Sequence, residues 1–296
     1  MSSKFKKHFI TGLLFLIAFL AAILFILPTV LTITNSFMTE KEINANYGAM
    51  IESASADKKT YISENLNLKF IPDSVSIQQY LSVLFKSPDY LLKFWNSVIL
   101  VVPITVFQVL LASITAYGFS RYRGKIREII FFVYIILMLM PYQVTLVPNR
   151  LVSEFLGIFG TRWAIILPAV FSPFSVYLLT KIMRRIPNAY FEAARLDGAG
   201  EFQIFLYICL PLCRSAMLSV GLLVFIDYWN MVEQPLILLD NQDQYPLSVF
   251  LSQINTGDVG LAFAVAVVYM IPALLLFLYG EEYLVEGITY SGGVKG

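Results

Sequence analysis

Four side chains with a carboxylate or an amide group lie inside one long apolar segment of this chain, residues 215–239, and they are the side chains best suited to bind a polar solute. They are Asp227, Asn230, Glu233 and Gln234. In a helix, spacings of three and four place Asp227, Asn230 and Gln234 on one stripe, with Glu233 beside it. An ionised carboxylate at the centre of a membrane span costs at least ~2.5–3.5 kcal/mol, so Asp227 must face water, protein or a partner charge. The stripe predicts a solute path or, alternatively, contacts that join two subunits.

Side chains close to this stripe extend the predicted path. Tyr228 and Trp229 offer aromatic faces on which sugar rings can stack. Tyr142 and Gln143 follow Pro141 in another apolar segment and are weaker candidates. We expect the neighbouring Leu222 to face lipid.

The rest of the sequence offers no catalytic chemistry. Its single histidine is His8, and we interpret its two cysteines, Cys209 and Cys213, as small buried apolar residues. The sequence contains no G-x-x-x-x-G-K-[ST] loop to cradle phosphates, so we do not expect it to hydrolyse ATP. It has neither a Ser/His/Asp or Cys/His set nor clustered metal ligands. We therefore expect a protein that is not an enzyme and that binds no metal or cofactor of its own.

The composition is typical of a membrane protein. The chain is 58% hydrophobic and 14% charged, with a mean hydropathy of +0.72. A net charge of +1 gives no reason to expect a nucleic-acid partner. The first apolar segment exceeds the ~7–15 residues of a signal-peptide core, so we expect it to be retained. Six segments are long and apolar enough to span a bilayer: residues 9–34, 98–119, 129–147, 163–180, 215–239 and 260–279. The sequence thus predicts an all-α membrane protein with six transmembrane helices.

Basic residues at the ends of the short loops indicate the orientation. They gather at residues 4–7, 121–127 and 181–185, whereas the lysines of the long 35–93 loop are diluted by acidic residues. We therefore expect both termini and the loop 184–213 to lie in the cytoplasm.

We divide the chain into three parts on this basis: residues 1–34 with the first span, the extracytoplasmic loop 35–93, and a core of residues 94–296 that ends in a tail from residue 281. In the external loop, Pro72 initiates a turn that leads into an amphipathic segment, residues 77–85. This segment is either a cap over helix ends or a docking ledge for an external binding protein, and the two roles are compatible.

The loop 184–213 begins with a predicted polar helix. Pro187 is suited to a helix start, and Gly198 to a left-handed stop. Glu192 and Arg195 are three residues apart and share a face. Ala193 and Ala194 allow a neighbouring backbone to approach closely.

A second short helix follows at residues 201–209. We expect it to present Phe202, Ile204, Phe205 and Ile208 before Pro211 breaks it. A helix pair on a rigid transmembrane base is suited to docking another protein and transmitting its displacement. The alternative is a helix that lies on the membrane surface with its apolar residues among the lipid headgroups.

The run Phe191-Glu192-Ala193-Ala194-Arg195-Leu196-Asp197-Gly198-Ala199-Gly200, with Leu210-Pro211 beyond it, closely resembles the EAA loop of the membrane subunits of binding-protein-dependent ABC importers. Within that group it is similar to the carbohydrate branch, the MalG-like permeases of MetI-like fold. Asn96-Ser97, the run from Ala116 to Tyr122, Trp229-Asn230 and residues 287–296 extend the resemblance over residues 94–296.

This resemblance implies a permease half that pairs with a second, homologous permease in a bacterial plasma (inner) membrane. Its other partners would be an extracytoplasmic solute-binding protein and two ATPase subunits, which carry ATP and Mg. The resemblance implies that the tail, through Gly292, Gly293, Val294 and Lys295, contacts the ATPase. It also implies that the following residues couple to the ATPase: Glu192, Ala193, Ala194, Arg195, Asp197, Gly198, Ala199, Phe202, Ile204 and Phe205.

The chain departs from the family pattern at two positions near the predicted path. Met231 stands where the family usually has an acidic residue, and Asp227 stands where it more often has an apolar or small one. We expect an importer of a sugar or oligosaccharide. One alternative is an ABC importer of a phosphorylated polyol or a peptide. Another is an ion-coupled transporter that uses Asp227 and Glu233 as its coupling carboxylates. Internal inverted repeats would support this alternative.

Overall fold

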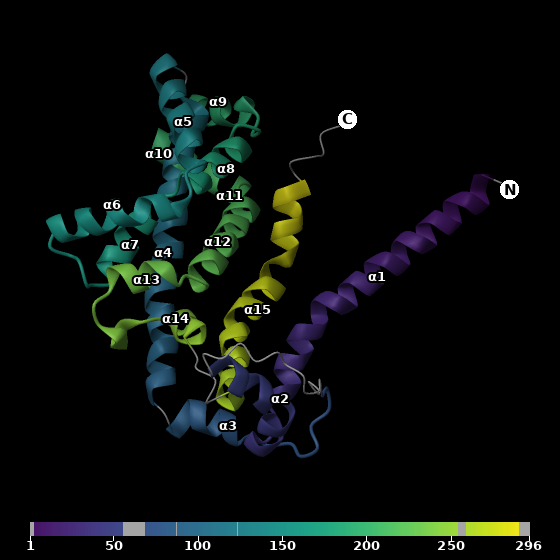
Figure 1. Cartoon of the computed structure of the whole chain (residues 1–296). Coiled ribbons are helices and arrows are strands. Elements are labelled where there is room, and N and C mark those ends of the chain that lie inside the picture. Colours follow the sequence, from purple (N-terminus) through teal and green to yellow (C-terminus); the bar gives the residue numbers. More distant parts are fainter. Residues whose placement is uncertain (1–2, 56–68, 87, 123, 254–258, 290–296) are drawn as a thin grey trace. The chain divides into compact units, whose positions relative to one another are not determined.

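The computed structural model describes residues 3–55, 69–86, 88–122, 124–253 and 259–289, and within these ranges the regular elements are all helices (Figure 1). They form two compact units. One comprises residues 1–91 and 253–270, and the other residues 92–252 and 271–296.

Four helices are long and apolar enough to cross a membrane: His8–Asn35, Asp89–Arg121, Trp163–Met183 and Gly260–Tyr283. Two bent helix pairs also qualify if each pair is counted as one span, which gives up to six spans. The first pair, Lys125–Met138 with Tyr142–Phe155, is bent by 104°, and the second, Glu201–Leu212 with Arg214–Trp229, by 75°. The predicted helical membrane fold is confirmed, although two of its spans are broken.

The first unit packs part of the 35–93 segment against the end of the first span. Its elements are α1 (Ser3–Asn35), α2 (Glu40–Ser55), α3 (Gln78–Leu81), the π-helical η1 (Ser82–Lys86) and the start of α15 (Val259–Thr289). Met38, Ile43 and Tyr47 form a small core against which Phe263 packs. Asn35 donates to the Tyr47 hydroxyl over 2.7 Å, and the Gln79 amide donates to the Met38 carbonyl over 2.8 Å. The predicted amphipathic segment at residues 77–85 is helical from Gln78.

In the second unit, the third predicted span is divided at Pro141. Its elements up to the loop 184–213 are α4 (Pro88–Arg121), α5 (Lys125–Met138), α6 (Tyr142–Phe155), α7 (Trp163–Ala169) and α8 (Pro173–Met183). A continuous helix over residues 129–147 was expected, but the chain turns at residues 139–141. Proline has no N–H to donate and disfavours the helical conformation of the residue before it, so the helix stops and restarts at Tyr142.

The fifth predicted span, residues 215–239, is also interrupted. The elements here are α9 (Asn188–Leu196), α10 (Glu201–Ile204), η2 (Phe205–Cys209), α11 (Leu210–Leu212), α12 (Arg214–Trp229), α13 (Glu233–Leu238), η3 (Gln242–Gln244) and α14 (Leu247–Ser252). Helix α12 ends at Trp229 and α13 begins at Glu233. Asp227 therefore lies two residues from a helix end, not at the middle of a 25-residue helix.

Polar side chains of α4 hold the segment that follows α13. Asn96 donates to the carbonyls of Asp243, over 2.6 Å, and Tyr245, over 3.2 Å, and accepts from Arg162. The Ser97 hydroxyl accepts from the backbone N–H of Leu247. Because buried backbone groups need partners, this pair of residues fixes the return of the chain between η3 and α14.

Candidate coupling loop and translocation path

Helix α9 begins directly after Pro187, as predicted, and ends at Leu196. Gly198 has φ of +82°, a left-handed conformation that glycine adopts without a Cβ penalty. The N–H of Gly198 donates to the carbonyl of Arg195, and that of Ala199 to the carbonyl of Ala194. These bonds satisfy carbonyls left over at the helix end, so the predicted C-terminal stop is confirmed.

The two alanines of the motif face opposite ways. Glu192, Ala193 and Arg195 are exposed, as are Asp197 and Gly198 in the turn. Ala194 is buried together with Phe191. Ala194 was expected to let a partner backbone approach, but its side chain is buried.

The second helix of the loop shows a different outer face from the one predicted. Ile204 and Phe205 were expected to be presented to a partner, yet both are buried. Phe202 is 71% exposed and Ile208 is partly exposed. Pro211 was expected to break the helix, but the helical run continues from Glu201 to Leu212, and the chain bends by 75° at Cys213 instead.

Sequence reasoning missed two strongly exposed apolar side chains of the loop. Leu196 is 89% exposed and Tyr207 is 77% exposed. Tyr207, Ile208, Gln203 and residues 197–199 line a groove of about 420 Å³. Leu196 could have been identified from the sequence, because it is a large apolar residue at the end of an exposed helix. A loop without a partner rarely gains stability from exposing such a side chain.

An ion pair joins the two helices of the loop, α9 and α10. Arg195 Nε lies 2.8 Å from Glu201 Oε1, and the hydrogen bond with Glu201 raises the pKa of Arg195 above its ordinary value. The Tyr117 hydroxyl of α4 donates to the other oxygen of Glu201 over 2.8 Å. The Gln203 side chain accepts from the N–H of Gly200 and caps the start of α10. The two loop helices are thereby fixed to each other.

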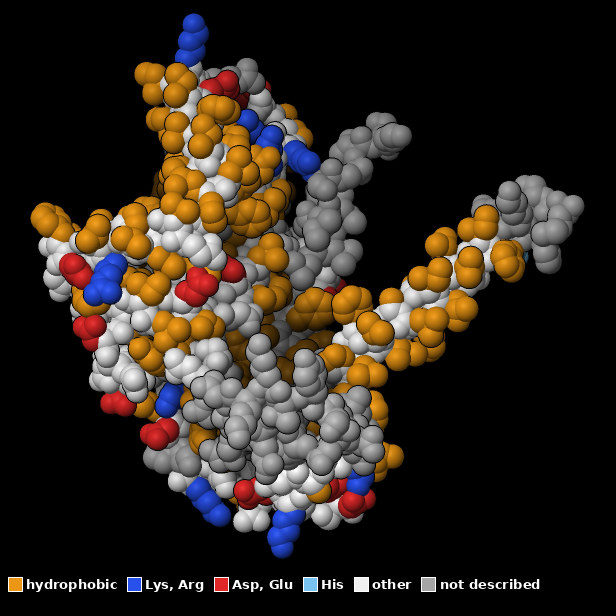
Figure 2. Space-filling model, viewed as in Figure 1, with side chains coloured by type: hydrophobic (Ala, Val, Ile, Leu, Met, Phe, Trp, Pro, Cys, Tyr) orange, Lys and Arg blue, Asp and Glu red, His pale blue; other side chains and the backbone are white. Residues whose placement is uncertain are grey.

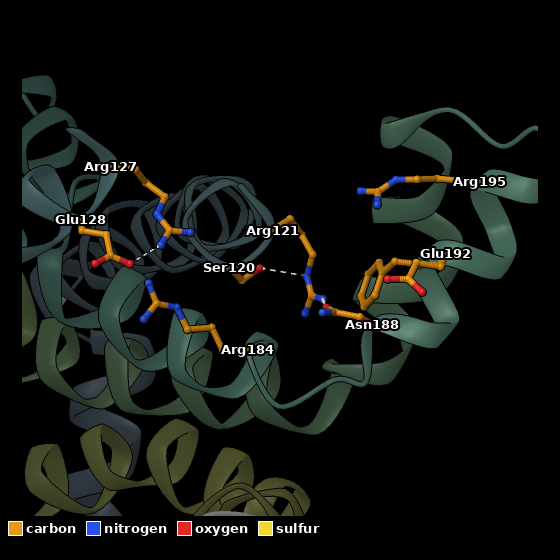
Figure 3. Close-up of a pocket in the computed structure, with 9 residues that line it drawn as sticks. Ser120, Arg121, Arg127, Glu128, Arg184, Asn188, Glu192 and Arg195 are labelled. Atoms are coloured by element: carbon orange, nitrogen blue, oxygen red, sulfur yellow. Dashed lines mark hydrogen bonds and ion pairs between the residues drawn. The ribbon is translucent and has the colours of Figure 1, made fainter. Parts of the chain in front are cut away.

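A cavity of about 560 Å³ separates α9 from the ends of α4, α5 and α8, and Figure 3 shows the residues around it. Its lining residues are Ser120, Arg121, Arg127, Glu128, Arg184, Asn188, Phe191, Glu192 and Arg195. In Figure 3, Arg121 extends from α4 toward Asn188. Arg127, Glu128 and Arg184 lie on the side of Arg121 that is away from Asn188. Arg127 and Arg184 both donate to the Phe119 carbonyl, so they cap the end of α4.

A second cavity, of about 410 Å³, collects the residues of the predicted path. It is lined by Tyr142, Ile226, Asp227, Tyr228, Asn230, Met231, Val232, Glu233 and Gln234. Figure 2 shows acidic side chains on the surface near the place where α12 gives way to α13 in Figure 1. The predicted helical stripe is not continuous, because α12 ends at Trp229. The break in the helix nevertheless leaves Asp227, Asn230 and Gln234 on the wall of one cavity.

Two of the predicted path residues do not line this cavity. Trp229 is 1% exposed, stacked on Phe225 at 5.2 Å between ring centroids and packed edge-on against Phe94. Its ring is therefore part of the core here and offers no face to a sugar. Gln143 is exposed on α6 but is not among the lining residues. Leu222, expected to face lipid, is buried.

The tail residues Gly292, Gly293, Val294 and Lys295 lie outside the described residues. Within the described ranges, no group of three or more His, Cys, Asp or Glu side chains could hold a metal ion.

Residues 108–289 match the family model described as "Binding-protein-dependent transport system inner membrane component". The chain belongs to this family. The match includes the loop 184–213 and the residues of both cavities. The family is a membrane component of transport systems, so the chain is a transport subunit with several apolar helices, as predicted.

Several members of the family resemble this chain over most of its length. The arabinooligosaccharides transport system permease protein AraQ of Bacillus subtilis is 30% identical, with 78% of this chain and 83% of the relative covered. The AraQ protein of Halalkalibacterium halodurans is 28% identical, with 82% and 88% covered. The diacetylchitobiose uptake system permease protein NgcG of Streptomyces coelicolor is 32% identical, with 66% and 67% covered.

A solved structure has a fold similar to that of this chain. It is the crystal structure of a bacterial ABC transporter involved in the import of the acidic polysaccharide alginate. One of its chains superposes with a TM-score of 0.77 at 20% identity, with 96% of this chain and 98% of that chain covered.

Proposed function

We propose that this chain is the permease subunit of an ATP-driven importer for a sugar or oligosaccharide, and that it forms one half of a heterodimeric pore. The observation that carries the proposal is the loop 184–213, a braced helix pair with exposed apolar side chains inside a family of inner-membrane transport components. The solute class is supported by the relatives, whose names include transport systems for arabinooligosaccharides and diacetylchitobiose.

The energy for transport comes from separate ATPase subunits, which bind ATP and Mg. This chain has no phosphate-binding loop, so its part is to receive mechanical displacement. We propose that the ATPase docks on the exposed face of the loop, where Glu192, Leu196, Phe202 and Tyr207 offer one carboxylate and three large apolar side chains. Such a mixture of apolar anchors and charge is typical of protein interfaces. The tail residues Gly292 to Lys295 extend this contact.

The solute passes the cavity beside Asp227 and Glu233, whose oxygens, with Asn230 and Gln234, can bond sugar hydroxyls. A binding protein delivers it from outside, and the second permease supplies the facing wall. Both termini and the docking loop are cytoplasmic, in keeping with the basic residues at the loop ends.

The test is reconstitution of the full transporter in liposomes with ATPases, a second permease and a binding protein from the same organism. Radiolabelled arabinotriose, lactose and diacetylchitobiose are the probes. We expect ATP-dependent uptake of at least one of them, with the binding protein outside and ATP inside. Uptake driven by an ion gradient without ATP would instead support the ion-coupled alternative. Uptake of none of the saccharides, with ATP-driven uptake of a peptide or polyol phosphate, would overturn the solute class.

A further inference from the structure

We propose that Arg121 is a positioning residue that fastens the docking loop to α4, so that displacement of α9 reaches a helix to which it is not directly linked in sequence. This rests on the proposed function of the loop. The chain itself connects the loop only to α8 and α12. The side chains of α4 add a third connection.

The guanidinium of Arg121 contacts three groups of α8 and α9, and its Nε also donates to the neighbouring Ser120 Oγ over 3.3 Å. Its Cζ lies 3.7 Å from the centre of the Phe191 ring, and its Nη1 donates to Asn188 Oδ1 over 3.1 Å. Its Nη2 donates to the carbonyl of Met183, at the end of α8. A planar group with five N–H donors can satisfy such a set, and a cation over an aromatic face adds attraction. The last residue of α4 is thereby bound to both ends of the α8–α9 connection.

Tyr117 makes a second link one helical turn earlier on α4, and residues four apart share a helix face. Its hydroxyl donates to Glu201, and its ring lies 6.5 Å from that of Phe191 and 5.2 Å from that of Phe205. Arg121 therefore holds α9 while Tyr117 holds the start of the second loop helix. Two attachment points resist rotation as well as translation, so the loop and the end of α4 behave as one rigid element.

The simpler explanation is that Arg121 only marks the cytoplasmic end of a span. Arg127 and Arg184 fit that explanation, since both donate to the Phe119 carbonyl of α4. Three contacts of Arg121, by contrast, are with α8 and α9. The difference supplies a matched control, because Arg127 lines the same cavity and carries the same charge.

The experiment compares Arg121→Gln with Arg127→Gln in the reconstituted transporter. The first readout is solute imported per ATP hydrolysed. We expect Arg121→Gln to lower this ratio at least about fivefold, the lower end of typical coupling between sites, while ATP hydrolysis continues. Arg127→Gln should change it much less. Arg121→Lys keeps the charge but not the planar fork, so it should fall between wild type and Arg121→Gln.

The second readout needs no transported solute. Spin labels at Ala189 on α9 and Ile114 on α4, both exposed, report the distance between the two helices. We expect a narrow distribution that is unchanged between nucleotide-free and ATP-bound states, and a broad one with Arg121→Gln. If the distance changes with ATP in the wild type, or if Arg121→Gln and Arg127→Gln behave alike, the positioning role is wrong. Absence of ATP-driven uptake in the wild type would instead count against the proposed function.

Discussion

The Tyr142 hydroxyl donates a 2.7 Å hydrogen bond to Glu233 Oε2, which joins the first residue of α6 to the first residue of α13. Each residue directly follows an interruption of an apolar segment. Both line the cavity that contains Asp227. Irregular backbone at membrane depth is tolerated only where protein or water surrounds it, so two helix breaks beside one polar cavity support a solute path there.

Glu192→Lys should leave the protein in the membrane but reduce uptake by about tenfold or more, because reversing a charge at a docking surface introduces repulsion. The measurement is ATP-dependent uptake together with the amount of ATPase that co-purifies. Glu128→Lys is the control, since Glu128 lines the same cavity from α5, away from the loop. Equal effects of the two substitutions would contradict the docking role of Glu192.

Replacing Gly198 should lower uptake, and the loss should be larger the less well the new residue adopts a positive φ. A Cβ at Gly198 would meet nothing within 4 Å, so alanine suffers only the left-handed backbone, about 1–2 kcal/mol. Asparagine tolerates this conformation better, and proline cannot adopt it. We expect uptake to fall in the order Asn, Ala, Pro at equal membrane levels. Normal transport by Gly198→Pro would show that the turn is not needed.

Local chemistry explains which features of the loop the sequence revealed. The turn at Gly198 and the start after Pro187 follow from backbone preferences of single residues, so they could be predicted. The inward orientation of Phe205 could not, because its ring packs against that of Tyr117, which is distant in sequence. The breaks at Pro141 and after Trp229 lie inside segments whose hydrophobicity alone predicts continuous spans.

Trp229→Ala should destabilise the protein by about 3–5 kcal/mol, the usual cost of removing a large buried aromatic side chain. The measurement is the thermal unfolding midpoint of the purified chain in detergent. Tyr228→Ala is the matched control, because Tyr228 is partly exposed and lines the cavity. We expect it to affect uptake more than stability. If Trp229→Ala instead lowered uptake more than stability, Trp229 would belong to the solute path.

Deletion of residues 291–296 should lower substrate-stimulated ATPase activity without changing membrane insertion. Gly292 and Gly293 carry no side chains, so this part of the tail is suited to a narrow interface, and Lys295 supplies a charge for it. The control is Lys295→Gln, which keeps the length of the tail and should have a smaller effect. Unchanged stimulation after the deletion would mean that the tail has no coupling role.

Asp227→Asn should lower uptake or shift solute preference while leaving assembly with the second permease intact. Asp227 is exposed on the wall of the cavity, and its replacement keeps size and hydrogen bonding but removes the charge. The loss should therefore appear in transport of a polar solute, measured as uptake of the saccharide probes, and not in the amount of co-purified permease. Leu223→Ala is the control on the same helix, because Leu223 is exposed, whereas Leu222 is buried. If Asp227→Asn instead abolishes co-purification, this carboxylate joins the two subunits, and the path must be sought along the remaining residues of the cavity.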